Sequence, residues 1–381
     1  MAQPLSAPRP APIDVSDEVL DDLRERLSRT RWPEQVEGSG WDYGVDIAYI
    51  RDLCEYWQTQ YDWRAQERRL NEYPLFLCEV DGLDIHFWHV KGTGQNPLPL
   101  LLVHGWPGSI YEFLELIGPL SDPARFGGEP GDSFDLVIPS LPGFGFGGQP
   151  RVPGWGIGRI AAALDTLMVD VLGYPQYGVQ GGDWGAVTAR RLAAAHADHV
   201  VAIHSNLPAV AAPPGDLTEK EQATWDAHQR KATAEGGYSA IQGTKPDTLT
   251  VAQSDSPAGL AAWIVEKFRT WSDCGGDLES VYSKDDLLTN LMFYWAPNST
   301  ASAARIYFES FRAFEELFSV PQRPVGFAYF AADTFALERR FVEAEFPIEH
   351  WTTMPAGGHF AALEQPGLLV DDVRAFFRGR R

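Results

Sequence analysis

Residues 177–185 read YGVQGGDWG, a short strand-like run that leads into Asp183 between small residues. The run predicts a strand, and residues 186–195 predict the helix that follows it. A side chain thrust out on such a sharp strand-to-helix turn sits in strained backbone, which neighbours without bulk tolerate. The pattern therefore predicts a turn that presents Asp183 where turns of this kind commonly carry a nucleophilic serine.

An aspartate in this position changes the chemistry. Its carboxylate is ionised at pH 7 without help, so it can attack an alkyl carbon directly and form an ester. The start of the following helix favours its negative charge. A helix N-cap is the alternative role for Asp183, and residues elsewhere in the chain have to distinguish the two.

The chain around this turn alternates short apolar runs with helix-like segments. Strand-like runs lie at residues 98–103, 134–138, 200–203, 325–330 and 349–354, and helix-like segments lie at residues 110–120, 157–172 and 367–377. Such alternation predicts an α/β fold with a mainly parallel sheet and helices on both of its faces.

Two regions depart from this alternation. Residues 209–318 contain acidic helix-like segments and no convincing buried strand, which predicts a helical cap inserted over the carboxyl ends of the strands, where ligands bind. Residues 1–90 carry helix signals and then two strand-like runs joined by Asp81-Gly82, so we expect an N-terminal meander there. The expected core is residues 91–208 together with residues 319–381.

The composition narrows the class of protein. The 381 residues are 44% hydrophobic and 22% charged, as in ordinary globular proteins, and 52 acidic against 31 basic residues give a net charge of -21. This charge disfavours binding to nucleic acid and to anionic membranes. With no long apolar run and no signal-peptide pattern at the start, we expect a cytoplasmic protein without a membrane anchor.

The chain predicts neither a metal nor a cofactor. Its three cysteines are far apart, which is typical of reduced thiols, and no HExxH or paired CxxC motif occurs. Residues 143–148 match GxGxxG literally, but Pro150 and Pro153 follow where a dinucleotide site needs a helix. We interpret that stretch as a loop that lines a pocket.

A histidine and a second acid support the nucleophile role of Asp183. His359 lies in a small-residue loop after a late strand-like run, and Asp333 follows the run at residues 325–330. Nucleophile, acid and base in this chain order are those of α/β-hydrolases, so we predict that fold, with His359 as the base. Asp333 is the preferred orienting acid and Glu338 is the alternative.

The loop at residues 104–108, HGWPG, follows the apolar run at residues 98–103. In this fold the corresponding loop supplies a backbone N–H to an oxyanion hole, together with the N–H of the residue after the nucleophile. The two groups predicted here are the N–H groups of Trp106 and Trp184. We also expect aromatic side chains to line a substrate pocket. Beyond these two tryptophans, those side chains are Phe144, Phe146, Trp155 and Trp263.

These motifs together resemble microsomal-type epoxide hydrolases over nearly the whole chain. The resemblance rests on HGWP at residues 104–107, GDWG at 182–185, GY at 237–238 with TKPD at 244–247, and GHF at 358–360. It implies that residues 1–90 form the N-terminal region that wraps around core and cap in that family. It also implies two cap tyrosines that hold the epoxide oxygen, which match Tyr238 and Tyr307. The membrane anchor of the mammalian members has no counterpart here, and the chain is more similar to microbial and fungal forms.

The resemblance implies that the chain hydrolyses an apolar or aryl epoxide to a vicinal diol, with the epoxide and water as its small-molecule partners. Asp183 then forms a covalent ester that water activated by His359 hydrolyses. A haloalkane dehalogenase and a non-catalytic ligand-binding homologue are the alternatives. A biosynthetic role, as in antibiotic or other natural-product pathways, and a detoxifying role both fit, and a homodimer is left open.

Overall fold

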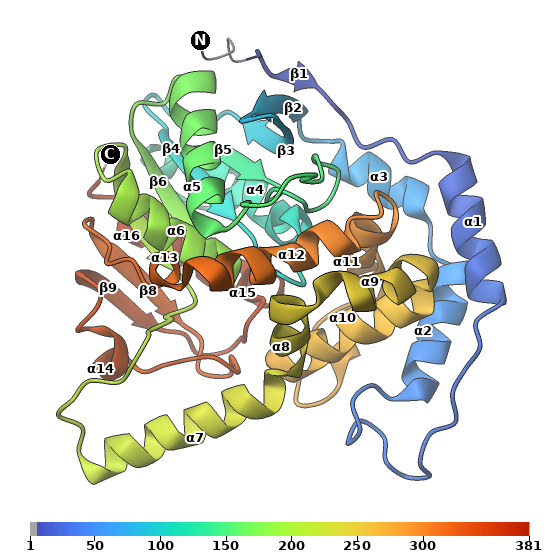
Figure 1. Cartoon of the computed structure of the whole chain (residues 1–381). Coiled ribbons are helices and arrows are strands. Elements are labelled where there is room, and N and C mark those ends of the chain that lie inside the picture. The colour runs from blue at the N-terminus through green and yellow to red at the C-terminus, as the bar shows by residue number, and fades with distance from the viewer. Residues whose placement is uncertain (1–5, 381) are drawn as a thin grey trace.

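A nine-stranded sheet forms the centre of the molecule in the computed structural model, which describes residues 6–380 (Figure 1). Its order is β1-β2-β3-β5-β4-β6-β7-β8-β9. The strands are β1 (Arg9–Pro10), β2 (Leu75–Val80), β3 (Leu83–Val90), β4 (Leu98–Val103), β5 (Phe134–Pro139), β6 (Tyr177–Gly181), β7 (Val200–Ser205), β8 (Val325–Tyr329) and β9 (Ile348–Thr353). From β5 to β9 neighbouring strands run parallel, whereas β1, β2 and β3 pair antiparallel at one edge. The predicted α/β fold with a mainly parallel sheet is therefore confirmed.

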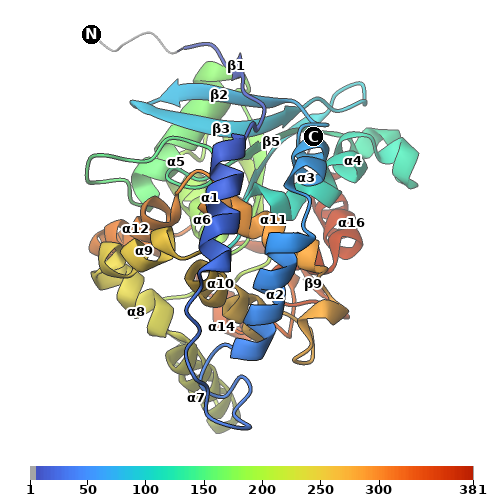
Figure 2. The ribbon, with the colours of Figure 1, turned by 90° about the vertical axis from the view of Figure 1, so that its right-hand side faces the viewer.

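Helices cover both faces of this sheet (Figure 2). On one side α4 (Leu114–Ser121) packs against α16 (Pro366–Phe377), and on the other α5 (Ile157–Thr166) packs against α6 (Trp184–Ala195). The central strands therefore have helices on both faces. This explains why every residue of β5 is buried and why the strand is apolar apart from one aspartate. These layers hold the carboxyl ends of β4, β6 and β8 in fixed positions.

The chain leaves the sheet after β7 and returns at β8. Between these strands lie α7 (Glu219–Glu235), α8 (Gly237–Thr244), α9 (Pro246–Asp255), α10 (Pro257–Trp271), α11 (Lys284–Trp295), α12 (Thr300–Ser310) and the short α13 (Phe314–Leu317). Proline opens α9 and α10, and the Ser283 side chain caps α11, as favoured helix starts require. This helical excursion occupies the position predicted for the cap, and α7 extends away from the body of the molecule (Figure 1).

The N-terminal segment reaches both the cap and the sheet. Helices α1 (Asp17–Ser28) and α2 (Ile47–Thr59) contact α10 of the cap, while α3 (Trp63–Leu70) leads into β2. The Tyr61 and Thr289 hydroxyls hydrogen-bond at 2.9 Å, which ties this segment to α11. Because β1, β2 and β3 extend the core sheet, the expected segment at residues 1–90 contains three strands of that sheet as well as the meander. The exact domain boundaries stay a prediction.

None of the helices within residues 6–380 is both long enough and apolar enough to cross a membrane.

Candidate active site

Asp183 lies on the turn between β6 and α6, with φ of 49° and ψ of -127°. A positive φ is strained for any residue with a side chain, so the surrounding structure has to enforce it. The turn also needs glycine at positions 181 and 185, where the backbone has no room for a side chain. A Cβ on Gly181 would lie 2.4 Å from the backbone of Gly185, and a Cβ on Gly185 would lie 1.8 Å from the Val103 oxygen. The turn thus has the strained backbone and the crowding that the sequence predicts for residues 181–185.

The loop after β4 supplies a hydrogen bond to the Asp183 carboxylate. The Trp106 N–H donates to Asp183 Oδ1 at 2.8 Å. His104 braces this loop, because its Nε2 accepts from the Leu141 N–H at 3.0 Å and its Nδ1–H therefore donates to the Gly105 oxygen at 2.9 Å. Burial lowers the pKa of His104 to about 4, which keeps the ring neutral as this pattern requires.

Trp184 is the first residue of α6 and follows Asp183 directly. The first backbone N–H groups of a helix have no partner within the helix and point toward its N-terminal end. Trp106 in the loop after β4 and Trp184 at the start of α6 are thus both neighbours of Asp183, and the oxyanion hole stays a prediction.

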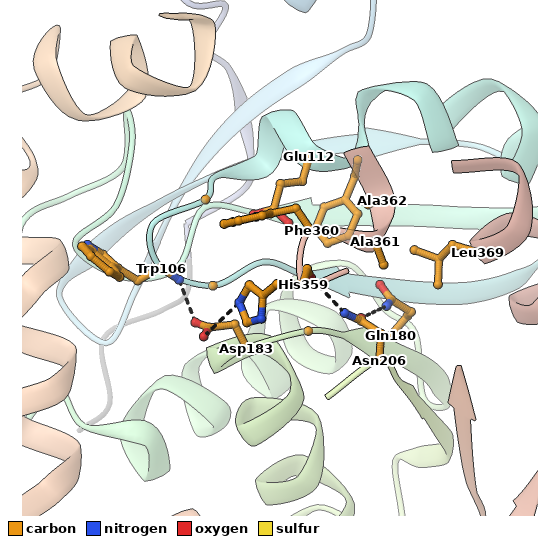
Figure 3. Close-up of a pocket in the computed structure, with 14 residues that line it drawn as sticks. Trp106, Glu112, Gln180, Asp183, Asn206, His359, Phe360, Ala361, Ala362 and Leu369 are labelled. Atoms are coloured by element: carbon orange, nitrogen blue, oxygen red, sulfur yellow. Dashed lines mark hydrogen bonds and ion pairs between the residues drawn. The ribbon is translucent and has the colours of Figure 1, made fainter. Parts of the chain in front are cut away.

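His359 lies between the two acids, in the loop between β9 and α15 (Ala361–Glu364). Its Nε2 lies 3.5 Å from Asp183 Oδ2, and its Nδ1 lies 3.2 Å from both carboxylate oxygens of Asp333 (Figure 3 shows the pair with Asp183). Asp333 is buried on the turn after β8, and the alternative acid, Glu338, is exposed. The structure therefore brings together Asp183, His359 and Asp333, and it leaves Glu338 outside this group.

The two carboxylates determine the protonation of His359. Burial opposes its charge, but the negative charges of Asp333 and Asp183 and their hydrogen bonds outweigh that effect and raise the pKa of His359 well above its usual range. In the free protein we therefore expect a protonated imidazole between two carboxylates.

Glu364 fixes the loop that carries His359. Its carboxylate accepts the N–H of Gly358 at 2.8 Å and the N–H of Phe360 at 2.9 Å, one residue on each side of the histidine. It also accepts the Asp273 N–H at 2.8 Å, and this hydrogen bond connects the loop to the cap. No motif in the sequence marks Glu364, because a carboxylate that accepts backbone N–H groups in this way follows no fixed spacing.

Tyr238 on α8 and Tyr307 on α12 stand together over the Asp183 turn. Their ring centroids are 5.7 Å apart at nearly right angles. The Tyr238 ring stacks on Trp106 at 5.0 Å, and the Tyr307 ring meets the edge of Trp184 at 4.8 Å. The two cap tyrosines are thus held against the two residues that flank Asp183.

Both phenols are kept protonated by their surroundings. Burial, followed by neighbouring groups that include the Asp183 carboxylate, raises the pKa of Tyr238 and of Tyr307 above the usual value for tyrosine. The buried Tyr307 hydroxyl makes no hydrogen bond of normal geometry within residues 6–380, although the side chains of Tyr238 and Trp184 lie near enough to affect its pKa. A buried donor without a partner is costly, so this hydroxyl is available to a ligand.

A cavity of about 280 Å³ connects these groups. Asp183, Trp184, Tyr238 and Tyr307 border it, and the remaining wall is mostly apolar. Apolar side chains on this wall include Val187, Leu207, Val210, Trp225, Phe311, Leu317, Phe318, Phe335 and Leu337. Its size is at the lower end of the range for small-molecule sites.

The pocket aromatics predicted from sequence lie elsewhere. Phe144 packs against the His104 ring at 5.2 Å, Phe146 packs against Phe293, Trp155 lies under the Arg159 guanidinium, and the Trp263 N–H donates to Gln242. None of the four borders the cavity with Asp183. Aromatic side chains fill cores as readily as pockets, so composition and loop position did not separate the two.

The cap also holds the loop at residues 104–108 in place. The Asn290 side-chain amide donates to the Pro107 oxygen at 2.8 Å, and the Tyr294 hydroxyl donates to the Gly108 oxygen at 2.6 Å. Both side chains belong to α11 and are buried. Their separation of more than 180 residues from their partners left no local signal in the sequence.

One cluster within residues 6–380 has donor atoms close enough to hold a metal ion, namely Asp165, His196 and His199. These side chains are already hydrogen-bonded, since both Nδ1 atoms lie 2.9–3.0 Å from the Asp165 carboxylate, which also accepts from the Tyr177 hydroxyl. The cluster lies at the other end of α6 from Asp183 and is not part of this site.

Comparison with known proteins gives a consistent result. Residues 8–113 match the family described as Epoxide hydrolase N terminus, and residues 99–249 match the alpha/beta hydrolase fold. A protein of Stigmatella aurantiaca, provisionally assigned as an epoxide hydrolase, is 43% identical over 98% of this chain and 85% of its own length. Epoxide hydrolase 1 of Oryctolagus cuniculus is 36% identical over 97% of this chain and 88% of its own length. The crystal structure of juvenile hormone epoxide hydrolase from Bombyx mori superposes with a TM-score of 0.89 at 31% identity, covering 98% of this chain and 95% of that one.

Proposed function

This chain belongs to the epoxide hydrolase family, and from that premise we propose that it converts an apolar epoxide into a vicinal diol through an ester of Asp183. The family makes the chain a hydrolase, and the course of the reaction is our inference from the site. One observation carries it: Asp183 borders the same cavity as Tyr238 and Tyr307, and its Oδ2 atom lies 3.5 Å from His359 Nε2.

In the first step the Asp183 carboxylate attacks one epoxide carbon, and the bond between that carbon and the ring oxygen breaks. The developing alkoxide takes a proton from the phenols of Tyr238 and Tyr307, whose raised pKa values keep them protonated. Such positioned acids typically contribute about 10²–10⁴-fold. The product is a hydroxyalkyl ester of Asp183.

Ester formation changes the charge that surrounds His359. Asp183 is one of the two carboxylates that raise the pKa of this histidine, and its negative charge disappears when the ester forms. The imidazolium therefore becomes a stronger acid and gives up its proton. The phenolate left by the first step regains one proton, so the proton lost by His359 balances the one that the epoxide oxygen has gained and the net charge of the site is unchanged.

In the second step the neutral His359 takes a proton from water, and the resulting hydroxide attacks the carbonyl carbon of the ester. The tetrahedral oxyanion is held by the N–H groups of Trp106 and Trp184, where one lost donor costs about 2.7–4 kcal/mol. The bond from the carbonyl carbon to the alkyl oxygen then breaks, and the alkyl oxygen takes the remaining proton of the attacking hydroxide. Diol, carboxylate and imidazolium are the products, which restores the free enzyme.

Buried phenols also bear on the haloalkane dehalogenase alternative. A departing halide needs no proton, whereas a departing alkoxide does. Two protonated phenols in a cavity with the nucleophile therefore favour an epoxide over an alkyl halide. The apolar wall favours an apolar or aryl epoxide.

Incubation of the purified chain with styrene oxide, an aryl epoxide, tests this proposal. We expect 1-phenylethane-1,2-diol, detected by chromatography, and no halide release from 1-chlorohexane under the same conditions. Halide release without diol formation would contradict the proposed substrate class.

A further inference from the structure

Asp183 lies between two cavities of different character. The first is the apolar cavity that it shares with the cap tyrosines. The second is a small cavity on the side of His359, bordered by Glu112, Gln180 and Asn206 (Figure 3). Asp183 and the loop residue Gly105 also border this second cavity, which places it directly behind the carboxylate.

The second cavity has the size and polarity of a water site. Its volume of about 10 Å³ is close to the space that one water molecule needs. Cavities of this size that hold water offer it two to four polar partners, whereas apolar cavities stay empty. Here the border includes two carboxyl groups, two amides and an imidazole.

Gln180 leaves hydrogen-bonding capacity unused beside this cavity. It is 1% exposed, and its amide nitrogen donates to Asn206 Oδ1 at 3.1 Å. Asn206 in turn donates to the His359 backbone oxygen at 3.4 Å. The Gln180 Oε1 atom has no hydrogen-bond partner within residues 6–380. A buried amide oxygen without a partner is uncommon and points to a ligand such as water.

Glu112 brings an unusual carboxyl group to the same cavity. It lies on the short helix η1 (Ile110–Phe113), six residues after Trp106. Its carboxyl occupies the space beside Gly108, since a Cβ there would lie 1.5 Å from Glu112 Oε1. Burial and, to a smaller extent, the Asp183 charge raise the pKa of Glu112 to about 8, although His359 opposes this shift. Glu112 is partly buried as a whole residue, and a pKa raised in this way favours the protonated carboxyl, which can both donate and accept a hydrogen bond.

We propose that this small cavity binds the water that hydrolyses the Asp183 ester, with Glu112 as its positioning residue. The proposal rests on the proposed function. Once the ester has formed, its alkyl group fills the apolar cavity, so water has to approach the carbonyl carbon from the other side of Asp183. A water already seated there meets both the carbonyl carbon and His359. Its proton passes to His359 Nε2, its oxygen bonds to the carbonyl carbon, and Glu112 keeps its own proton.

The test uses variants of Glu112 and resolves the two steps by rapid mixing. Glu112→Leu removes the polar group, Glu112→Gln keeps a donor and an acceptor, and Glu115→Gln is the control because Glu115 is exposed three residues away. We expect Glu112→Leu to slow ester hydrolysis on the order of 100-fold, the cost of misplacing a reactant, with ester formation changed less than about twofold. Intact-protein mass spectrometry should then show the ester accumulating. Glu112→Gln should hydrolyse the ester within about fivefold of the wild-type rate, and Glu115→Gln should hydrolyse it at the wild-type rate.

A pH profile separates positioning from a structural effect. In the wild type, the hydrolysis rate should change through an ionisation well above the usual range of a glutamate, because burial raises the pKa of Glu112, and Glu112→Gln should lack that ionisation while retaining the others. Three results would contradict the water site while leaving the proposed function intact. They are hydrolysis at the wild-type rate in Glu112→Leu, equal slowing of both steps in that variant, and an unchanged ionisation in Glu112→Gln. If no variant, including the wild type, forms an ester, the proposed function itself fails.

Discussion

The core and the cap bring different chemistry to Asp183. The core supplies charged groups from loops at the carboxyl ends of its strands: His359 lies 3.5 Å from Asp183 and 3.2 Å from Asp333. The cap supplies neutral phenols from helices, Tyr238 and Tyr307, held against Trp106 and Trp184. Under the proposed function the nucleophile and the base come from the core, whereas the acid and most of the cavity wall come from the inserted cap. If this division is right, core and cap variants should fail at different steps.

Asp183→Asn should have the largest effect. It keeps the shape of the side chain and the oxygen that accepts from the Trp106 N–H, but it removes the nucleophile. We expect diol formation from styrene oxide to fall by at least about 10⁴-fold, by analogy with the removal of other covalent nucleophiles. Steady-state product assays measure this loss, and thermal melting checks that the variant is folded. Retention of more than a few per cent of the activity would contradict the role of Asp183 as the nucleophile.

The double variant Tyr238→Phe/Tyr307→Phe tests the cap. Both hydroxyls disappear while the aromatic packing on Trp106 and Trp184 remains. Ester formation should slow by about 10²–10⁴-fold because the leaving oxygen loses its acid, and each single variant should lose less. Rapid-mixing measurements of ester formation give these rates. If the double variant forms the ester at the normal rate but hydrolyses it slowly, the phenols act in the second step, which contradicts the proposed role.

Asp333→Ala tests the core at the second step. Without Asp333, the base loses its orienting partner and a main source of its raised pKa. We expect ester hydrolysis to slow by roughly 10²–10³-fold, with a much smaller effect on ester formation, since orienting acids support the base. Glu338→Ala is the matched control, because Glu338 is exposed and lies outside the group. Equal slowing of both steps by Asp333→Ala would place the orienting role elsewhere.

The smallest effect concerns stability and pH. The pKa of His359 is raised in the folded state, so folding favours its protonated form. Its contribution to stability is complete below about pH 6.5, the unfolded value, and is lost as the pH rises through the folded-state pKa. The difference in unfolding free energy between wild type and His359→Gln, measured with urea, should therefore shrink in the alkaline range. For Tyr307→Phe the difference should stay constant from pH 6 to about pH 9, because burial raises the pKa of that phenol above its usual value near 10. A constant difference for His359→Gln would contradict the charged pair.

Sequence reasoning succeeded where the chemistry is local. The strand-turn-helix around Asp183 follows from glycines whose replacement would collide with backbone, and the order of the later strands placed Asp333 and His359. It failed where a side chain holds a loop in place. Asn290 contacts a loop 183 residues away, whereas Glu364 and Glu112 contact loops within six residues of themselves, and no sequence motif marks either kind of contact. The cap tyrosines lie between these cases, since only the resemblance to a family singled them out among 13 tyrosines.

The covalent ester is the central claim, and one turnover in ¹⁸O-labelled water tests it most directly. With enzyme in excess over styrene oxide, the water oxygen should enter the Asp183 carboxylate, because hydroxide attacks the carbonyl carbon of the ester. Mass spectrometry of the peptide that contains Asp183 should show a gain of one ¹⁸O atom, and the diol of that first turnover should be unlabelled. A labelled diol with an unlabelled Asp183 would mean that water attacks the epoxide directly, and would contradict the account.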